Sequence, residues 1–401
     1  MTDAPMDIIS PAVEDSSHAD SLASCATEAI HLTQWVQSYG FVLVCDAATR
    51  LLERASQNTA QFLAIDPAAA LGSPIAEWFE GGERAFSLAI QQVTPGTPQL
   101  VDLQFRPELL RVSGLELVAH WVAGEVVFEA MPCDSSGRGG LDEANVEALI
   151  DSLAELRRPN ALHSFLQGCA TELRRLTGYQ RVMIYRFLPD WSGEVIAESH
   201  AAETTERYLG LRFPASDIPP QARELYKINL LRIIADVDAE PAQLLATADA
   251  AMLDQSHGLL RCPSPMHIRY LQNMGVRATL VISLLKDGEL LGMVACHHNE
   301  PKVPPNQLRR STRNLCALIA EATTQRIDSL RQVEVASRAL KLRDVGNRFA
   351  ERLRQDGDFQ KLMETALGEA AEPLQVQGFG LFLHGQWLIK PPLPDEHCEA
   401  V

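Results

Sequence analysis

The sequence predicts an α+β protein that contains two small sensor-type domains and a long helix. Short apolar runs that alternate like strands recur over residues 41–131, with short helical stretches between them. A second series of the same kind covers residues 146–297. From residue 305 to about 355 the pattern is helical and has few breakers. A length of 401 residues allows roughly two or three domains of about 100–200 residues each.

The first series predicts one small domain that follows a polar leader. Residues 1–24 are rich in Ser, Asp and Ala without sustained periodicity, so we expect them to be disordered or only locally ordered. The apolar run 41–45 predicts a strand, and a helical stretch is expected at 51–64. Three more strands are expected at 99–106, 115–121 and 124–131, the last two joined through Val122, Ala123 and Gly124.

The second series predicts a further α+β domain after a linker at 131–145, which is rich in Gly, Ser and Asp. Prolines interrupt the segment 211–220, so it cannot form a long regular element. Lys286-Asp287-Gly288 is a hairpin signal between two strands. The expected helices are 146–157, 161–176 and 220–228, and the expected strands are 181–187, 194–199, 232–237, 278–286 and 290–297.

The helical stretch 305–355 is too long to bury its apolar face on one small domain. We therefore expect it to pack in a dimeric bundle or to lead rigidly to another domain. A shorter helix at 358–370 and two strand-like runs at 378–383 and 386–389 predict the opening of a third domain.

Composition argues against several classes of function. The chain has 35 Lys+Arg and 52 Asp+Glu, and its formal charge of −17 disfavours both nucleic acid and anionic membranes as partners. There is no apolar run of about 18 residues that would span a membrane, and the acidic start of the chain does not resemble a signal peptide. We therefore expect a cytoplasmic protein.

The cysteines and the motif search predict neither a metal site nor an enzyme. None of the 8 cysteines forms a C-x-x-C pair or has zinc-binding spacing with His, so most are expected to be free thiols. The sequence also shows no phosphate-binding loop, no nucleophile elbow and no H-E-x-x-H motif.

Four stretches carry the chemistry: FPASDIP at 213–219, RCPSPMH at 261–267, YLQNMGVR at 270–277 and ACHH at 295–298. If they converge, they offer a carboxylate, imidazoles, phenols and guanidiniums on an apolar wall. Arg suits carboxylates, and Asp with His suits a ligand that has protonatable N–H groups. The implied ligand is large, planar and apolar, with acidic arms and internal N–H donors, which describes a linear tetrapyrrole.

With FPASDIP and SPMH-x-x-YLQNMGVRA in this order, the chain resembles the bacterial phytochromes. The resemblance implies a PAS domain and a GAF domain, each an antiparallel sheet with flanking helices. It also implies that a figure-of-eight knot links them, in which the leader passes through a GAF loop, and that a long helix follows. The implied boundaries are a leader at 1–24, PAS at 25–132, a linker at 133–145, a bilin-binding GAF domain at 146–325, a connecting helix at 326–355 and the N-terminal fragment of a PHY domain at 356–401.

The resemblance implies a role for each pocket residue. Asp217 matches the aspartate whose main-chain carbonyl faces the pyrrole nitrogens, and His267 matches the histidine beside the central rings. His297 matches the histidine that bonds the D-ring carbonyl, while Arg232 and Arg261 match the propionate clamps. The other implied chromophore contacts are Tyr185, Phe213 and Tyr270 around ring D, Ser264 and Thr279 near the propionates, and Ile218 and Met183.

Cys25 indicates the type of chromophore. Phytochromes with more reduced bilins carry the attaching Cys directly before the GAF histidine, where this chain has Met266. Bacterial members use a leader Cys a few residues before an Ile-His pair, which Cys25 and Ile30-His31 match. The implied cofactor is biliverdin IXα, attached through a thioether. Cys262 is an extra thiol, either an inert core residue or a second attachment site.

Two departures from the family pattern concern the leader and one propionate contact. The family reads I-H-x-P-G-x-I-Q-P-H-G, whereas residues 30–40 read I-H-L-T-Q-W-V-Q-S-Y-G and lack the Pro-Gly and Pro-His pairs. Val281 stands where many members have a propionate-binding Ser, for which the nearby Thr279 could substitute.

The implied function is red/far-red light sensing by Z/E isomerisation of the bilin. The signal is expected to reach a homodimer through the GAF domain and the long helix. No kinase or cyclase motif follows, so the output partner is unknown. Because the chain ends before the PHY tongue, we expect an incomplete or unstable photoproduct.

Two other classes of function stay open on the sequence alone. One is a GAF module that binds a cyclic nucleotide or another small regulator. The other is a degenerate PAS–GAF scaffold that acts only by dimerisation, which the altered leader allows. A test for covalent biliverdin separates all three hypotheses.

Overall fold

The fold is described from a computed structural model of the chain. It describes residues 28–96, 98–133, 143–159, 161–248, 250–303, 310–355, 359–374, 376, 379–383 and 386–389. By its internal contacts the chain divides into two units, Met1–Pro159 with His163–Gln325, and Asn160–Leu162 with Arg326–Val401. The first unit contains two antiparallel sheets, and the second unit contains a small hairpin.

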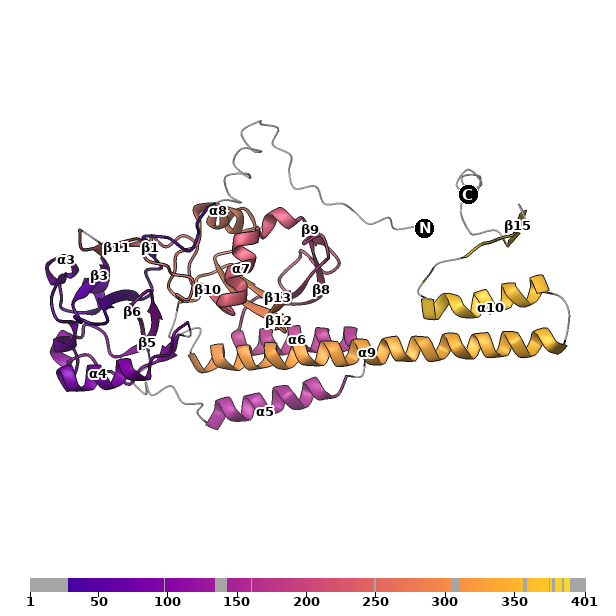
Figure 1. Ribbon diagram of the computed structural model, residues 1–401, viewed down its shortest axis with the longest axis horizontal. Helices are drawn as coiled ribbons and strands as arrows, with labels where there is room; N and C mark the ends of the chain where they lie inside the picture. Colours follow the sequence, from indigo (N-terminus) through magenta and orange to yellow (C-terminus); the bar gives the residue numbers. More distant parts are fainter. Residues whose placement is uncertain are drawn as a thin grey trace, which may run out of the picture. The chain divides into compact units, whose positions relative to one another are not determined.

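The first sheet has the strand order β1-β11-β3-β2-β6-β5-β4. Its strands are β1 (Trp35–Val36), β2 (Phe41–Asp46), β3 (Leu52–Ser56), β4 (Gln99–Leu100), β5 (Leu115–Val122), β6 (Glu125–Pro132) and β11 (Ala242–Ala246). The short helices beside them are α2 (Thr59–Phe62), α3 (Pro67–Ala70), α4 (Gly82–Gln92) and the 3₁₀ turns η1 (Ile75–Trp78) and η2 (Pro107–Leu109). An aromatic core centred on Phe79, Phe86 and Phe128 fills the space between this sheet and its helices. Figure 1 shows α3 beside β3 at one end of this domain.

The second sheet has the order β10-β12-β13-β7-β8-β9. Its strands are β7 (Arg181–Phe187), β8 (Gly193–His200), β9 (Arg212–Phe213), β10 (Leu231–Ile234), β12 (Ala278–Lys286) and β13 (Glu289–His298). The accompanying helices are α5 (Glu143–Arg157), α6 (Leu162–Thr177), η3 (Ala215–Asp217), α7 (Pro220–Ile228) and α8 (Pro265–Asn273). The β12–β13 hairpin turns at Asp287 and Gly288, whose φ angles of 52° and 81° are the left-handed pair that a tight hairpin needs.

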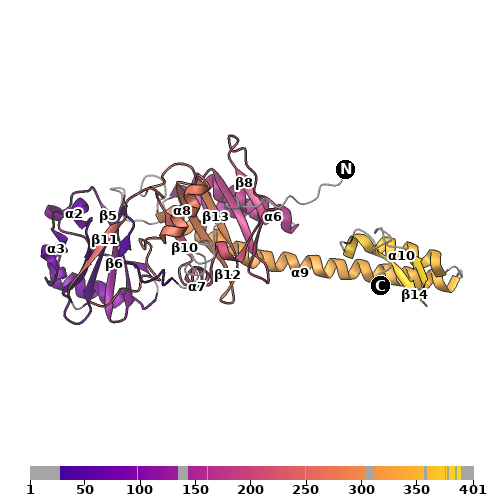
Figure 2. The ribbon, with the colours of Figure 1, turned by 90° about the horizontal axis from the view of Figure 1, so that it is seen from above.

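A crossing loop, residues 235–262, joins the two sheets. It leaves the second sheet after β10, contributes β11 to the first sheet by pairing with β3, and returns before α8 (Figure 2). Residues 33–37, which follow the leader in the chain, lie between the two arms of this loop. On one side Leu244 N donates to Gln34 O at 2.8 Å, and on the other Gln37 N donates to Leu260 O at 2.8 Å. The predicted figure-of-eight knot further needs residues 1–24 to pass through this loop, and those residues lie outside the described part of the chain.

The long helix α9 (Arg310–Gln355) begins in the first unit. There its residues Leu315, Cys316 and Ile319 are fully buried, and Arg313 forms an ion pair with Glu116 of β5. In the second unit the remainder of α9 is joined by α10 (Phe359–Leu374), β14 (Leu381–Leu383) and β15 (Gln386–Ile389). Within the described part of the chain, none of the helices combines the length and apolar character needed to cross a membrane.

Several sequence-based boundaries were wrong. Residues 52–56 form strand β3 rather than a helix, because β2 and β11 supply hydrogen-bonding partners on both edges. The strand expected at 99–106 is only β4, since pairing with β5 stops at Leu100. The strand expected at 232–237 is β10 and ends at Ile234. The leader 1–24 and most of the linker, 134–142, lie outside the described residues.

Candidate functional site

Two adjoining cavities lie over one face of the second sheet, under α7 and α8. The larger has a volume of about 480 Å³ and the smaller about 90 Å³. The larger lies within the range of about 300–1,000 Å³ that is usual for small-molecule sites. Residues that border both cavities are Asp217, Ile218, Tyr226, His267, Tyr270, Thr279 and Val281.

Strand alternation builds the floor of the cavities. Successive side chains of a strand point to opposite faces, so odd-numbered residues of β7, β12 and β13 share one face. The cavity-lining residues of these strands are Met183, Tyr185, Thr279, Val281, Met293, Ala295 and His297. The even-numbered Cys296 instead lies near Cys316 of α9, on the opposite face. The predicted residues Met183, Tyr185, Thr279 and His297 therefore come together for a simple geometric reason.

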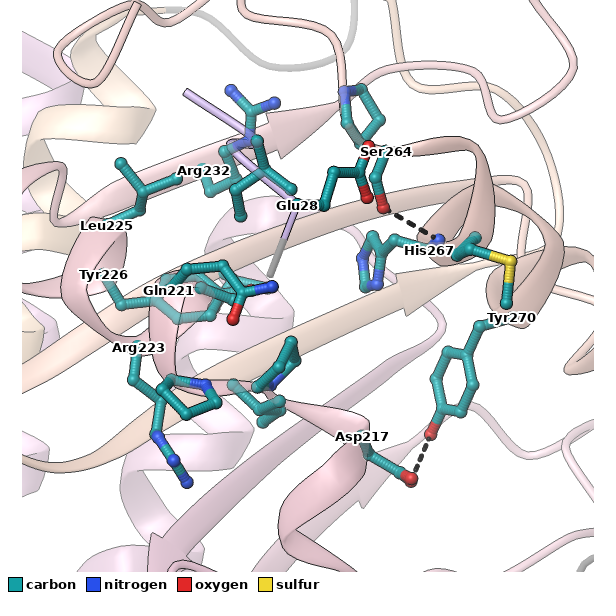
Figure 3. Close-up of a pocket in the computed structure, with 18 of the residues that line it drawn as sticks. Glu28, Asp217, Gln221, Arg223, Leu225, Tyr226, Arg232, Ser264, His267 and Tyr270 are labelled. Atoms are coloured by element: carbon teal, nitrogen blue, oxygen red, sulfur yellow. Dashed lines mark hydrogen bonds between the residues drawn. The ribbon is translucent and has the colours of Figure 1, made fainter. Parts of the chain in front are cut away.

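Asp217 stands on the cavity wall because prolines shape its segment. Pro214 and Pro219 have extended ψ angles of 156° and 162°, so the chain makes only one 3₁₀ turn, η3, before α7 starts at Pro220. The Asp217 carboxylate accepts a hydrogen bond from the Tyr270 hydroxyl at 3.2 Å (Figure 3). Burial raises the pKa of Asp217, and the hydrogen bond from Tyr270 opposes that rise.

Helix α8 presents His267 and Tyr270 to the cavity. Ser264 caps the helix by accepting from His267 N at 3.3 Å, and Pro265 occupies the first helical position. Residues three apart lie on the same helix face, and the rings of His267 and Tyr270 are 6.2 Å apart with an interplanar angle of 13°. In Figure 3 these two side chains lie on the side of the cavity opposite Tyr226 and Arg232.

Both cavity histidines are neutral at pH 7. Burial lowers the pKa of His267 to about 4, and the charges of Arg232 and Arg261 act in the same direction. Burial likewise lowers the pKa of His297 to about 3, assisted by Arg181. His297 Nδ1 is buried and has no hydrogen-bond partner among the described residues. It is therefore available to a ligand.

The two predicted arginine clamps line the larger cavity but are held by main-chain carbonyls. The Arg232 guanidinium donates to Arg261 O and, at 3.5 Å, to Gly258 O. The Arg261 guanidinium donates from Nη1 to Ile30 O at 3.0 Å, while its buried Nε has no partner in the described chain. Burial, together with the charge of the neighbouring Arg232, lowers the pKa of Arg261 to about 9.

The remaining predicted residues divide into two groups. Phe213, Ile218 and Ser264 border the cavities. Cys262 is partly buried and does not line either cavity; burial raises its pKa, and the two arginines oppose that rise. Cys25 lies outside the described residues.

Sequence reasoning missed several residues that line the larger cavity, among them Arg223, Tyr226 and Glu28. Arg223 and Tyr226 are three residues apart in the predicted helix 220–228, and that spacing could have placed both on one face. Arg223 is buried, and its guanidinium carbon lies 4.5 Å from the centre of the Trp191 ring. Glu28 gave no comparable signal beyond its place three residues after Cys25.

Family comparisons match both domains of the first unit. A model described as "PAS fold" matches residues 25–130, and one described as "GAF domain" matches residues 161–327. Two bacteriophytochromes, from Pseudomonas aeruginosa and Xanthomonas campestris, are each 35% identical to the chain, over 80% and 77% of its length. The aligned regions make up 44% and 48% of those relatives, so the chain spans about half the length of the curated relatives it matches.

Solved structures agree with this assignment. The chromophore-binding domain of a Stigmatella aurantiaca phytochrome is 34% identical with a TM-score of 0.65, and the match covers 75% of this chain and 98% of that structure. The photosensory core module from the same organism is 30% identical with a TM-score of 0.74, and the match covers 94% of this chain and 74% of that module. The chain therefore belongs to the bacteriophytochrome family, of which it carries a PAS–GAF module.

Proposed function

We propose that the chain is the light-sensing part of a red/far-red photoreceptor and that its cavity holds a bilin. The observation that carries the proposal is the cavity of about 480 Å³ that Asp217, His267 and Tyr270 line together with two buried guanidiniums. A solved relative named as a chromophore-binding domain supports it, because this chain covers 98% of that structure. The chain would act as a sensor rather than as an enzyme.

The cavity fits a linear tetrapyrrole in its chemistry. Apolar side chains such as Ile218 and Val281 form walls for a planar ring system. Thr279 Oγ1 and His297 Nδ1 are buried polar atoms that lack a partner within the described segments. Since buried polar groups are normally hydrogen-bonded, these atoms mark places where a ligand would supply the partner.

The arginines would bind the acidic arms. Guanidinium groups match carboxylates in a two-point geometry, and Arg232 and Arg261 both border the larger cavity. Each now donates to a main-chain carbonyl, so a ligand carboxylate would replace or share that contact. The nearby Tyr226 hydroxyl belongs to the same region, since Arg232 and Arg261 both act on its pKa.

Light absorption and Z/E isomerisation at the C15=C16 bond are what the bilin would supply when bound. The protein's residues would bind and orient the chromophore and respond to its rotation. The hydrogen bond from Tyr270 to Asp217 could break and form again, because both groups are on the cavity wall. His297 with a proton on Nδ1 would donate to a carbonyl, and neutral His267 would exchange a proton near the ring nitrogens.

We propose biliverdin IXα as the bilin and Cys25 as its attachment site. Addition of the Cys25 thiol across a vinyl group forms one S–C bond and delivers the thiol proton to the other vinyl carbon, so no oxidant is needed. Glu28 lines the larger cavity only three residues after Cys25, which supports a leader that reaches the bilin. Cys262 is the alternative attachment site.

The remaining parts of the proposal concern organisation. We place the leader at 1–24, the PAS domain at 25–132, a linker at 133–145, the GAF domain at 146–325, a connecting helix at 326–355 and a PHY fragment at 356–401. We propose a cytoplasmic homodimer that forms through the GAF domain and the long helix and signals to an unidentified output partner.

The test is to add biliverdin to the purified protein and follow absorbance before and after red light. Zinc-enhanced fluorescence on a denaturing gel then reports covalent attachment. We expect a covalent band that Cys25→Ala removes and that the matched thiol variant Cys262→Ala retains. A band lost only in Cys262→Ala would mean that the attachment site is wrong. A colourless protein would favour a cyclic-nucleotide module or a scaffold that only dimerises.

A further inference from the structure

One charged side chain of the first sheet reaches the crossing loop and is buried there. Glu129 lies in the middle of β6 and is 1% exposed. Its neighbours Phe128 and Ala130 point into the aromatic core, so strand alternation turns Glu129 to the opposite face. There its carboxylate accepts two main-chain hydrogen bonds, from Leu260 N at 2.7 Å and from Leu259 N at 2.9 Å.

The two amides that Glu129 binds lie between the two carbonyls that Arg232 binds. Gly258 O and Arg261 O flank Leu259 and Leu260 in the chain, and both accept from the Arg232 guanidinium. The same four-residue segment also carries the Arg261 side chain. Its path therefore determines where both guanidiniums of the cavity wall stand.

The packing leaves this segment little freedom. A Cβ atom built on Gly258 would lie 3.2 Å from Gln255 O and 3.4 Å from Glu129 Oε1. The contact with the main-chain oxygen of Gln255 is tight and the one with Glu129 is an ordinary van der Waals contact, so an alanine at 258 would strain this segment while touching the Glu129 carboxylate. The Gln37 side chain adds a third restraint, since it donates to Arg261 O at 3.3 Å.

The charges around Glu129 come from three elements. Arg232 of β10 and Arg313 of α9 both act to lower the pKa of Glu129, while burial has the larger effect and raises it. On β5, Glu116 is paired with Arg313. The carboxylate is therefore both a partner for two amides and a counter-charge for Arg232, and the two roles predict opposite results when the charge is removed.

We infer that Glu129 is a positioning residue for the acidic arms of the ligand. By holding residues 258–261, it sets the guanidiniums of Arg232 and Arg261 at the places where ligand carboxylates meet them. The inference rests on the proposed function, because it needs a ligand with acidic arms. It gives the first domain a part in recognition at a cavity that lies in the second.

The experiment compares biliverdin with its dimethyl ester, in which both acidic arms are capped. Dissociation constants are measured by absorbance titration in the Cys25→Ala background, so that binding stays reversible. The quantity of interest is the preference ratio, the dissociation constant of the ester divided by that of the free acid. We expect the parent protein to prefer the free acid, because only the acid can pair with the arginines.

Glu129→Gln is expected to lower the preference ratio by roughly tenfold, the effect of misplacing about one charged hydrogen bond. Gln cannot accept from both amides as the carboxylate does, so the segment moves. If Glu129 were only a counter-charge, its neutralisation would leave the charge of Arg232 uncompensated. The free acid would then bind more tightly, and the preference ratio would rise. A raised ratio, or an equal loss of affinity for both ligands, would overturn the inference.

Two further variants test this interpretation independently. Gly258→Ala strains the same segment against Gln255 O without changing any charge, and it should also lower the preference ratio even if Glu129→Gln does not fold. Glu125→Gln is the matched control, because Glu125 is on the same strand and pairs with Arg54 instead. It should leave the ratio unchanged. If the parent protein binds both ligands equally, the proposed arginine contact fails and this inference fails with it.

Discussion

One histidine of the first unit is buried without a hydrogen-bond partner for its ring among the described residues. His120 on β5 is fully buried, and neither ring nitrogen has a hydrogen-bond partner in the portion of the chain described. Its ring centre lies 5.9 Å from that of His257 in the crossing loop. Burial lowers the pKa of His120 to about 4, the nearby His257 acts in the same direction, and Asp254 opposes both. The fold thus stabilises a neutral imidazole at the contact between the first sheet and the loop.

His120 should make stability depend on pH. Its pKa falls from 6.5 in the unfolded chain to about 4 in the fold, so its stabilising contribution is complete above 6.5 and is lost as pH falls toward 4. Between pH 6.5 and 4, the free energy of unfolding should therefore fall less in His120→Leu than in the parent protein, by up to about 3 kcal/mol. Urea denaturation of both proteins across the window measures the difference. Parallel curves would contradict this prediction.

At the scale of elements, strands with their own pattern were predictable and strands that depend on distant partners were not. The hairpins β5–β6 and β12–β13 follow from local alternation and turn residues, and the structure has both. By contrast, β1 and β11 consist of a few residues, and the strands with which they pair are each other and β3. The strand that pairs with β1 lies about two hundred residues later in the chain, so the residues around β1 could not have revealed the pairing.

The same distinction applies to the site. Asp217 and His267 lie in distinctive proline-flanked motifs, and both border the cavities. Arg223 and Tyr226 lie in an ordinary-looking helix, so only the packing of α7 against the sheet revealed them. In the sequence, Glu129 is one charged residue within a strand. Its structural role depends on a loop that lies 130 residues later in the chain.

Strand β8 makes room for a cavity residue. A Cβ atom built on Gly193 would lie only 1.7 Å from the Tyr185 ring. We therefore expect Gly193→Ala to displace Tyr185 and to weaken biliverdin binding by roughly tenfold or more, as overpacking of a tight site does. Absorbance titration measures the affinity. Gly346→Ala on exposed α9 is the control, because nothing lies within 4 Å of its Cβ, and there the change should stabilise the helix by up to about 1 kcal/mol.

At the scale of the whole first unit, several contacts join the first sheet to the crossing loop and to α9. Among them are the β3–β11 pairing, the two main-chain hydrogen bonds that Glu129 accepts from the crossing loop, and the ion pair between Arg313 of α9 and Glu116 of β5. The Arg313 and Glu116 side chains are only 6% and 11% exposed. Removing one partner would leave a buried charge, so both sheets should unfold together rather than independently.

We expect Arg313→Met to lower the free energy of unfolding by about 3 kcal/mol. In a double-mutant cycle with Glu116→Gln, the interaction free energy should be about 1 kcal/mol or more. Chemical denaturation followed by fluorescence gives these values. Arg348→Met is the comparison on the same helix, since Arg348 and its partner Glu369 are 49% and 32% exposed and such pairs contribute less than about 1 kcal/mol. Equal effects at both arginines would count against the prediction.

The position of residues 33–37 between the arms of the crossing loop also has a consequence for synthesis. Gln255 donates to Thr33 O, although the two residues are 222 positions apart. At about 5–20 residues per second, a ribosome would finish the crossing loop roughly ten to forty seconds after it has made residues 33–37. During that interval these residues emerge from the ribosome with no loop around them, and the loop must later close around a segment that is already present. The order of translation thus favours wrapping over threading, whereas a chain refolding from denaturant has no such order and must find the arrangement by search.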